Sequence, residues 1–245
     1  MRKGLKLLVL AGSAEARMIA AAARDDGADV IALMSESPRG PNPMPVPYTL
    51  HKLDEIKSIE AQMRKVDVVV DASHGFDEKM SRIGSAAAMA AGVPFLRYVR
   101  PGWSLEGKAL WKSAADVEQA MTMIAPGARV FSAAGWASLS ACAEFPGERL
   151  FLRQTNRHMR PVPFDFVELV FGEAPFTAES EAALFKELRI DTLLARNLGG
   201  QASYPKVAAA ESLGLNVILI SPPALPQGIP EVDDVNAVLA WIGAQ

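Results

Sequence analysis

The chain has 245 residues, of which half are hydrophobic and 22% are charged, a composition that suits a folded core and excludes an intrinsically disordered protein. Its 25 basic and 28 acidic side chains leave a net charge of −3, which disfavours wrapping a polyanionic nucleic acid. The single Cys142 cannot form an internal disulfide, and no uncharged apolar run reaches the roughly 18 residues of a membrane span. We therefore expect a cytoplasmic globular protein without an export signal or a membrane or nucleic-acid partner.

Short apolar runs alternate with helix-like segments from the N-terminus onward. Continuous apolar strands between helices are typical of a parallel sheet that is covered on both faces and has right-handed crossovers. In the first half, the predicted elements are strand 5–11, helix 14–24, strand 29–34, helix 54–65, strand 66–70, helix 76–91 and strand 93–97. The Pro- and Gly-rich segment 38–47 predicts a loop.

The alternation is interrupted at 100–107, where Pro and Gly cluster, and then resumes. This break predicts two domains, 1–105 and 106–245. In the second half, the predicted elements are helix 116–124, strand 129–133, helix 136–143, strand 149–154, strand 167–171, helix 177–188, strand 192–196, helix 203–213, strand 216–220 and helix 232–242. The fold class is therefore α/β, with parallel sheets.

The first candidate site follows the first predicted strand, because ligands of open parallel sheets bind beyond the carboxyl ends of the strands. Gly12 permits close approach of a ligand or backbone, and Ser13 is a natural cap for the helix that starts at Ala14. The N–H groups of that helix start could receive a phosphate, and Arg17, on the same face as Ser13, could contact an anion. A plain turn and a solvated arginine are the alternatives.

Three further candidate sites also follow predicted strands. His74, in the segment 71–76, could donate to a phosphate or shuttle a proton, or could simply cap the next helix. Basic residues gather in two places, which suggests a partner with several carboxylates or phosphates, although a solvated surface is the alternative. They are Arg97 and Arg100, and then Arg149, Arg153, Arg157, His158 and Arg160. The loop 196–200, with paired glycines and Lys206 beyond it, is either a ligand-receiving loop or a plain turn.

Taken in order and spacing, these motifs resemble the precorrin-6A reductase family, which also includes cobalt-precorrin-6A reductases. The resemblance covers nearly the whole chain. The family's Gly-Gly-Thr-x-Glu-Ala-Arg is matched at 11–17, Asp-Ala-Thr-His-Pro-Phe at 71–76, the next block at 92–103, and Lys-Asn-Ser-Gly-Gly at 196–200. Lys206 and the Ser-Pro-Pro at 221–223 are also similar.

The resemblance implies two Rossmann-like domains with a ligand cleft between them, NADPH as cofactor and a polycarboxylate tetrapyrrole as substrate. The implied reaction reduces one double bond of precorrin-6A to give precorrin-6B in cobalamin biosynthesis, and other corrin-pathway enzymes are candidate partners. The expected cofactor-binding residues are Gly12, Ser13, Ala14, Ser35, Arg39, Ser73 and His74. The expected substrate-binding residues are Arg97, Arg100, Arg196, Asn197, Gly199, Gly200 and Lys206, with Arg17 as the candidate catalytic residue and no metal.

Two segments depart from the family pattern. The family often reads Ser-Leu-Ala-Gly-Arg after the second strand, whereas this chain places Glu36, which could oppose a phosphate, between Ser35 and Arg39. The family's Thr-Thr-Gly loop in the second domain is usually followed by a polar or basic residue, but here 133–136 reads Ala-Ala-Gly-Trp. The alternatives are another NAD(P)-dependent oxidoreductase with an acidic substrate, or a non-catalytic nucleotide-binding sensor.

Overall fold

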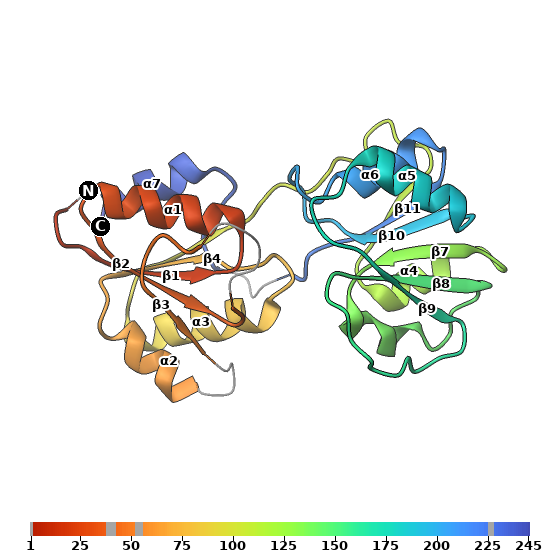
Figure 1. Cartoon of the computed structure of the whole chain (residues 1–245). Helices are drawn as coiled ribbons and strands as arrows, with labels where there is room; N and C mark the ends of the chain where they lie inside the picture. The colour runs from red at the N-terminus through yellow and green to blue at the C-terminus, as the bar shows by residue number, and fades with distance from the viewer. Residues whose placement is uncertain (1, 38–42, 52–55, 225–227) are drawn as a thin grey trace. The chain divides into compact units, whose positions relative to one another are not determined.

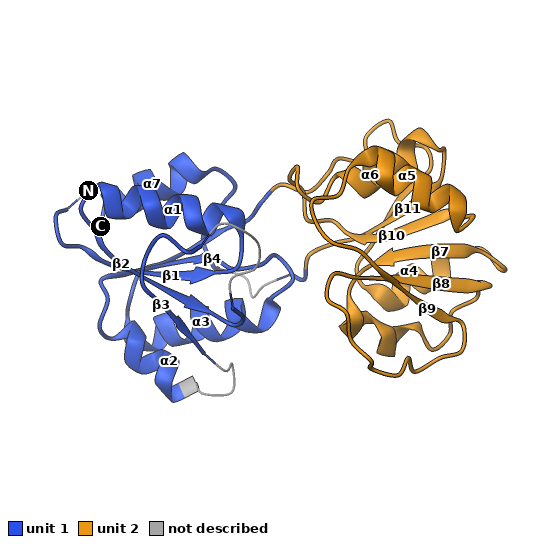
Figure 2. Cartoon of the chain, in the orientation of Figure 1, with its two compact units in different colours: residues 1–100, 223–245 blue, residues 101–222 orange. Residues whose placement is uncertain are grey.

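The computed structural model describes residues 2–37, 43–51, 56–224 and 228–245. It divides the chain into two compact units (Figure 2). Unit 1 comprises Met1–Arg100 and Pro223–Gln245, and unit 2 comprises Pro101–Pro222. The predicted domain 106–245 had included the C-terminal segment, which the structure places with unit 1.

Unit 1 contains a six-stranded parallel sheet in the order β3-β2-β1-β4-β5-β12. Its elements are β1 (Lys6–Ala11), α1 (Ala14–Asp25), β2 (Asp29–Met34), β3 (Tyr48–Leu50), α2 (Ile56–Met63), β4 (Val68–Ala72), α3 (Glu78–Ala91), β5 (Phe95–Tyr98), β12 (Glu231–Val232) and α7 (Val235–Gly243). Helices α1 and α7 cover one face of this sheet, and α2 and α3 cover the other (Figure 1).

The continuous apolar run of β1 follows from this burial on both faces. Leu7 and Val9 belong to the core cluster that contains residues of α1 and α7. Leu8 and Leu10 point to the opposite face and belong to the cluster that contains residues of α2 and α3. Successive side chains of a strand alternate between faces, so each face of the sheet receives apolar residues from the same strand.

Unit 2 repeats this architecture, with a six-stranded parallel sheet in the order β9-β8-β7-β10-β11-β6. Its elements are β6 (Trp111–Ala114), α4 (Val117–Met123), β7 (Arg129–Ala133), the 3₁₀ helix η1 (Trp136–Cys142), β8 (Arg149–Gln154), β9 (Val167–Phe171), α5 (Ala178–Glu187), β10 (Thr192–Arg196), α6 (Pro205–Ser212) and β11 (Asn216–Ile220). Helices α5 and α6 pack on one face, with Phe185 and Val207 in the same core cluster as Phe131 and Leu193 of the sheet.

Both sheets have the Rossmann strand order, in which the chain reverses direction across the sheet between its first and fourth strands. The sixth position is filled differently in the two units. In unit 1 it is β12, which comes from the C-terminal segment and pairs with β5 through Glu231 opposite Arg97. In unit 2 it is β6, which precedes the other strands and pairs with β11. The switch points of the two sheets therefore lie between β1 and β4 and between β7 and β10.

The prediction of parallel α/β architecture is confirmed, and several elements differ in detail. Strands β3, β6 and β12 were not predicted, because each lies at a sheet edge and none is a continuous apolar run. The predicted helix 136–143 is a 3₁₀ helix that starts after Gly135, whose φ of 88° favours glycine. The predicted loop 38–47 lies partly outside the described residues.

Candidate functional site

The switch point of unit 1 brings the loops after β1 and β4 into direct contact. The Ser13 hydroxyl donates to the carbonyl of Ala72 at 2.8 Å and accepts from the N–H of Ala16 at 3.0 Å, so it both caps α1 and ties the two loops together. A Cβ on Gly12 would lie 2.5 Å from the backbone nitrogen of His74. Gly12 is therefore required by the approach of the chain's own backbone, and this contact positions the N-terminus of α1 at the switch point.

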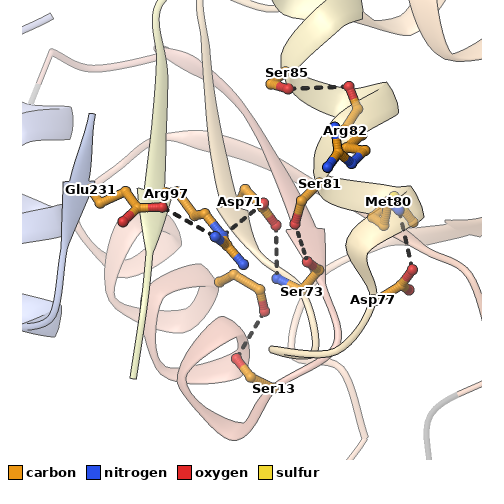
Figure 3. A network of polar contacts seen from close by, with 11 residues as sticks. Ser13, Asp71, Ser73, Asp77, Met80, Ser81, Arg82, Ser85, Arg97 and Glu231 are labelled. Atoms are coloured by element: carbon orange, nitrogen blue, oxygen red, sulfur yellow. Dashed lines mark hydrogen bonds and ion pairs between the residues drawn. The ribbon is translucent and has the colours of Figure 1, made fainter. Parts of the chain in front are cut away.

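The second loop of this site is ordered by polar contacts within the loop and with helix α3 (Figure 3). Asp71 Oδ1 accepts from the N–H of Ser73 at 3.0 Å, and the hydroxyl of Ser73 lies 3.2 Å from that of Ser81. The Nδ1 atom of His74 accepts from the N–H of Phe76 at 3.2 Å. The close approach of Gly12 to the backbone of Ser73 and His74 places both residues beside the Gly12 turn, and their role in cofactor binding stays a prediction.

Ser35 follows β2 and donates to Asp77 Oδ2 at 2.7 Å. Asp77 in turn caps α3, because its Oδ1 accepts from the N–H of Met80 at 3.1 Å. The hydroxyl oxygen of Ser35 keeps its acceptor capacity, but its hydrogen is already used. Arg39, the other residue expected to recognise a 2′-phosphate, lies outside the described residues.

Arg97 is an internal residue of unit 1. It is 7% exposed, and its Nε atom lies 3.6 Å from Oδ2 of Asp71, which is 1% exposed. Its Nη1 atom donates to Oε1 of Glu231 at 3.1 Å (Figure 3). Arg97 therefore joins β4, β5 and β12. This role differs from the expected substrate contact, because a guanidinium that is buried and paired within the sheet is not presented to a ligand.

Arg100 is also paired, with Glu15 in the first turn of α1. Its Nε donates to Oε1 of Glu15 at 2.8 Å, and its Nη2 contacts Oε2. Burial alone would raise the pKa of Glu15, but hydrogen bonding and the charge of Arg100 hold that pKa below its ordinary value. Arg100 is expected from the sequence to bind the substrate, whereas in the structure its guanidinium forms an ion pair with Glu15.

Arg17 lies one turn further along α1 and is half-buried. No acidic side chain among the described residues pairs with it. Arg100 neutralises the charge of Glu15, so the charge of Arg17 makes the start of α1 positive. The helix macrodipole adds to this charge, so the site suits an anion.

In unit 2, residues of the loop after β10 hold the loop's own conformation and bind a neighbouring segment of the chain. Asn197 accepts from the N–H of Trp103 at 2.7 Å through Oδ1, and it donates to the carbonyl of Trp103 at 3.2 Å through Nδ2. Gly199 and Gly200 have φ values of 59° and 72°, a backbone conformation that favours glycine. The amide of Asn197 is therefore engaged with the chain itself, and the two glycines shape the turn.

Arg196 ends β10 at the switch point of unit 2. Its guanidinium lies close to Gly135, where a Cβ would come 3.6 Å from Nη2 of Arg196. Burial lowers the pKa of Arg196 from its ordinary value. The turn after β7 and the end of β10 thus meet here, as the turn after β1 and the loop after β4 do in unit 1.

Lys206 is the most strongly perturbed cation of unit 2. Burial lowers its pKa to about 8, with an opposing effect from the charge of Glu181. Its Nζ donates to the carbonyl of Ser203 at 2.6 Å and lies 5.9 Å from the centre of the Trp103 ring. A lysine of this kind carries a proton near neutral pH and releases it more readily than a solvated lysine does.

Arg153 and Glu181 form a buried ion pair whose charges act on Lys206. The sequence did not indicate this pair. Arg153 Nη2 lies 2.7 Å from Oε1 of Glu181, and both side chains are largely buried. Gly172 makes room for this arginine, because a Cβ there would lie 2.3 Å from Arg153 Nη1. The position of Glu181, four residues before the buried Phe185 on one helix face, was the sequence signal for its burial.

The described residues contain no group of three or more His, Cys, Asp or Glu side chains that could hold a metal ion. None of the described helices is long and apolar enough to cross a membrane.

Two sheets of Rossmann order, each with a glycine-containing turn and cations at its switch point, define an α/β protein of the nucleotide-binding type. The chain belongs to the precorrin-6A reductase family, since a family model described as "Precorrin-6x reductase CbiJ/CobK" matches residues 6–243. The chain is therefore an oxidoreductase of cobalamin biosynthesis, and the family identified from the motifs is confirmed.

Individual relatives agree with this membership. The chain is 31% identical to precorrin-6A reductase of Rhodococcus erythropolis over 243 residues, covering 97% of each chain. It is 26% identical to cobalt-precorrin-6A reductase of Priestia megaterium, covering 91% of this chain and 92% of the relative. A solved structure of CobK precorrin-6A reductase matches with a TM-score of 0.85 and 29% identity, covering 98% of this chain and 96% of the other.

The family and the fold together indicate a nicotinamide cofactor and a tetrapyrrole substrate. A non-catalytic nucleotide sensor is not supported, because the matched family is one of reductases. The choice of NADPH over NADH and the roles of individual residues stay predictions.

Proposed function

We propose that this protein reduces precorrin-6A to precorrin-6B with NADPH. The observation that carries this proposal is the reductase family match over residues 6–243. A glycine turn and a helix N-terminus at the first switch point support a dinucleotide site there. When bound, NADPH would supply a hydride to one carbon of a macrocycle double bond, and the other carbon must receive a proton.

The switch point of unit 1 fits the diphosphate of such a cofactor. The turn of Gly12, Ser13 and Ala14 presents the N-terminus of α1, and the pairing of Glu15 with Arg100 removes the negative charge that would repel a phosphate there. Ser73 and His74 line the neighbouring loop. The remaining expected cofactor residues are Ser35 and Arg39, which follow β2, the strand whose end carries the ribose contact in Rossmann sheets.

For the substrate, the proposal rests on cations at the end of a central strand and at the start of the helix that follows it. In unit 2 these are Arg196 and Lys206, with the 199–200 turn beside them. We assign Asn197 a shaping role, because its amide holds Trp103. Arg97 and Arg100 are left out of the substrate site because both are paired inside unit 1.

The orientation of the substrate is assigned to Arg17. Lys206 has a pKa of about 8, so at neutral pH it is mostly protonated and can hold a carboxylate. Arg17 has no acidic partner among the described residues and lies one turn from the cofactor turn, where a guanidinium can hold a carboxylate in a fixed plane.

The test is to incubate the protein with precorrin-6A and NADPH, or NADH in a parallel reaction, and to follow the loss of absorbance of the reduced nicotinamide. Oxidation that depends on precorrin-6A, and is faster with NADPH, supports the proposal. If neither cofactor is oxidised, the proposed reaction is wrong. Equal rates with both cofactors refute the NADPH preference and leave the reduction itself standing.

A further inference from the structure

The loop after β8 carries a histidine that is fixed between two aromatic rings. The ring of His158 lies 4.9 Å from that of Trp136 and 5.8 Å from that of Phe171, in edge-to-face geometry with both. Its Nδ1 accepts from the N–H of Arg160 at 3.2 Å, and its Nε2 lies 3.2 Å from Oε1 of Gln154. Both ring nitrogens therefore have partners, and the three rings form one ordered group.

Two guanidinium groups lie over the ends of this group. The guanidinium of Arg157 is 5.4 Å from the centre of the Phe171 ring, and that of Arg160 is 5.9 Å from the centre of the Trp136 ring. Both side chains are exposed, and neither pairs with a carboxylate among the described residues. Arg153, on β8 itself, is by contrast paired with the buried Glu181. A guanidinium stacked on a ring keeps its N–H donors in its own plane, where they can reach a ligand.

The location of this group is the ligand-binding edge of unit 2. Trp136 follows the end of β7, the loop 155–163 follows the end of β8, and Phe171 is the last residue of β9. These three strands are neighbours in the sheet, so their carboxyl ends meet at one edge. Ligands of open parallel sheets bind beyond that edge.

We propose that Trp136, His158, Phe171, Arg157 and Arg160 form a subsite for the tetrapyrrole, which we name the aromatic–arginine patch. This inference rests on the proposed function, which supplies the ligand class. A tetrapyrrole offers an apolar conjugated ring and carboxylates at its rim. The patch offers aromatic surface for the ring and two unpaired guanidiniums for the carboxylates.

Trp136 gives the patch a specificity that the alanines before it cannot provide. Ala133 and Ala134 bring no hydroxyl to the turn after β7, so polar recognition by side chains of this turn is replaced by an aromatic ring. A nucleotide, with a flat base and phosphates, carries similar chemistry. Affinities for the tetrapyrrole and for NADPH therefore have to be measured together.

The decisive variant is Arg157→Gln combined with Arg160→Gln, with Lys112→Gln as the matched control. Lys112 is an exposed cation of unit 2 on β6, at the opposite edge of the sheet, and it has no acidic partner among the described residues. We expect the double variant to raise KM for precorrin-6A about tenfold with kcat changed less than about twofold, since such contacts hold ground state and transition state alike. Lys112→Gln should leave both constants unchanged.

Trp136 tests the aromatic component. Trp136→Leu should raise KM for precorrin-6A about fivefold, and Trp136→Phe, which keeps a ring, should raise it less. The thermal midpoint of each variant shows whether it is folded. The dissociation constant for NADPH should match that of the unaltered protein in every variant, and a loss confined to NADPH affinity would assign the patch to the nucleotide and overturn the inference.

A second probe separates this inference from the proposed reaction. Equilibrium binding of uroporphyrin, a planar polycarboxylate, can be followed by its fluorescence anisotropy whether or not the protein turns over precorrin-6A. Weaker uroporphyrin binding in the double arginine variant than in Lys112→Gln supports the subsite even if the reaction is not observed. Equal affinity of these two variants for uroporphyrin, or equal KM where turnover occurs, refutes it.

Discussion

Replacing Arg97 with Met should destabilise unit 1 far more than it impairs substrate binding. The magnitude follows from its two partners. Glu231 has a side chain that is 45% exposed, so losing its ion pair with Arg97 costs at most about 1 kcal/mol after solvent screening. Asp71 is 1% exposed, and its Oδ2 atom has no hydrogen-bond partner among the described residues. Leaving this carboxylate without Arg97 should cost about 3 kcal/mol, because a buried charge loses its counter-ion.

Hydrogen exchange at the amides of β4 and β5, measured at increasing urea concentrations, reports the free energy of unfolding of unit 1. We expect Glu231→Gln to lower the free energy of unfolding by about 1 kcal/mol or less, and Arg97→Met, which loses both partners, by about 3–4 kcal/mol. Combining Arg97→Met with Asp71→Asn should recover part of the loss, since the buried charge is then removed. If Arg97→Met instead raised KM for the tetrapyrrole while the free energy of unfolding stayed unchanged, Arg97 would contact the substrate and would not stabilise unit 1.

The remaining predictions concern the two switch points. Gly12→Ala should lower the free energy of unfolding by about 1–3 kcal/mol through the backbone clash and also weaken NADPH binding; unchanged thermal unfolding would contradict this. Arg39→Ala should narrow the preference for NADPH over NADH, measured as kcat/KM, by about 1.5–3 kcal/mol, and an equal loss for both cofactors would exclude a 2′-phosphate contact. Arg17→Ala should lower kcat in steady-state kinetics, and an unaltered kcat would remove Arg17 from the reaction centre. The charge of Glu181 raises the pKa of Lys206, so in Glu181→Gln the KM for precorrin-6A should begin to rise at a lower pH, and an unmoved pH profile of KM would remove Lys206 from substrate binding.

Strands buried on both faces could be predicted from the sequence almost residue by residue. The expected ranges 29–34, 129–133 and 192–196 coincide with β2, β7 and β10, because the buried middle of an interior parallel strand is mostly apolar on both faces. Edge strands such as β12 lack this pattern. The return of the C-terminal segment to unit 1 could not be predicted from chain order, since it depends on a pairing between β12 and β5 across more than a hundred residues of sequence.

In the candidate site too, local features could be predicted from the sequence and tertiary contacts could not. The turn at Gly12 and Ser13 was predictable, because a glycine and a capping residue between a strand and a helix are local features. What Gly12 accommodates was not predictable, since the neighbour is the backbone of His74 from another loop. Likewise, no local pattern distinguishes Arg97, whose partners are Asp71 and Glu231, from an arginine that faces a ligand.

The net charge at the start of α1 depends on both the local sequence and a residue that is distant in sequence. The segment 14–17 carries one acid and one base, so its sequence alone gives no net charge for an anion to recognise. In the folded unit, Glu15 is neutralised by Arg100, a residue 85 positions away, while Arg17 keeps its charge. The positive character of this helix start therefore arises from a tertiary ion pair. By this reasoning, Arg100→Gln should weaken NADPH binding without any direct contact, because it restores the negative charge of Glu15 beside the phosphate. A dissociation constant for NADPH that is unchanged in Arg100→Gln would show that Glu15 does not face the bound anion.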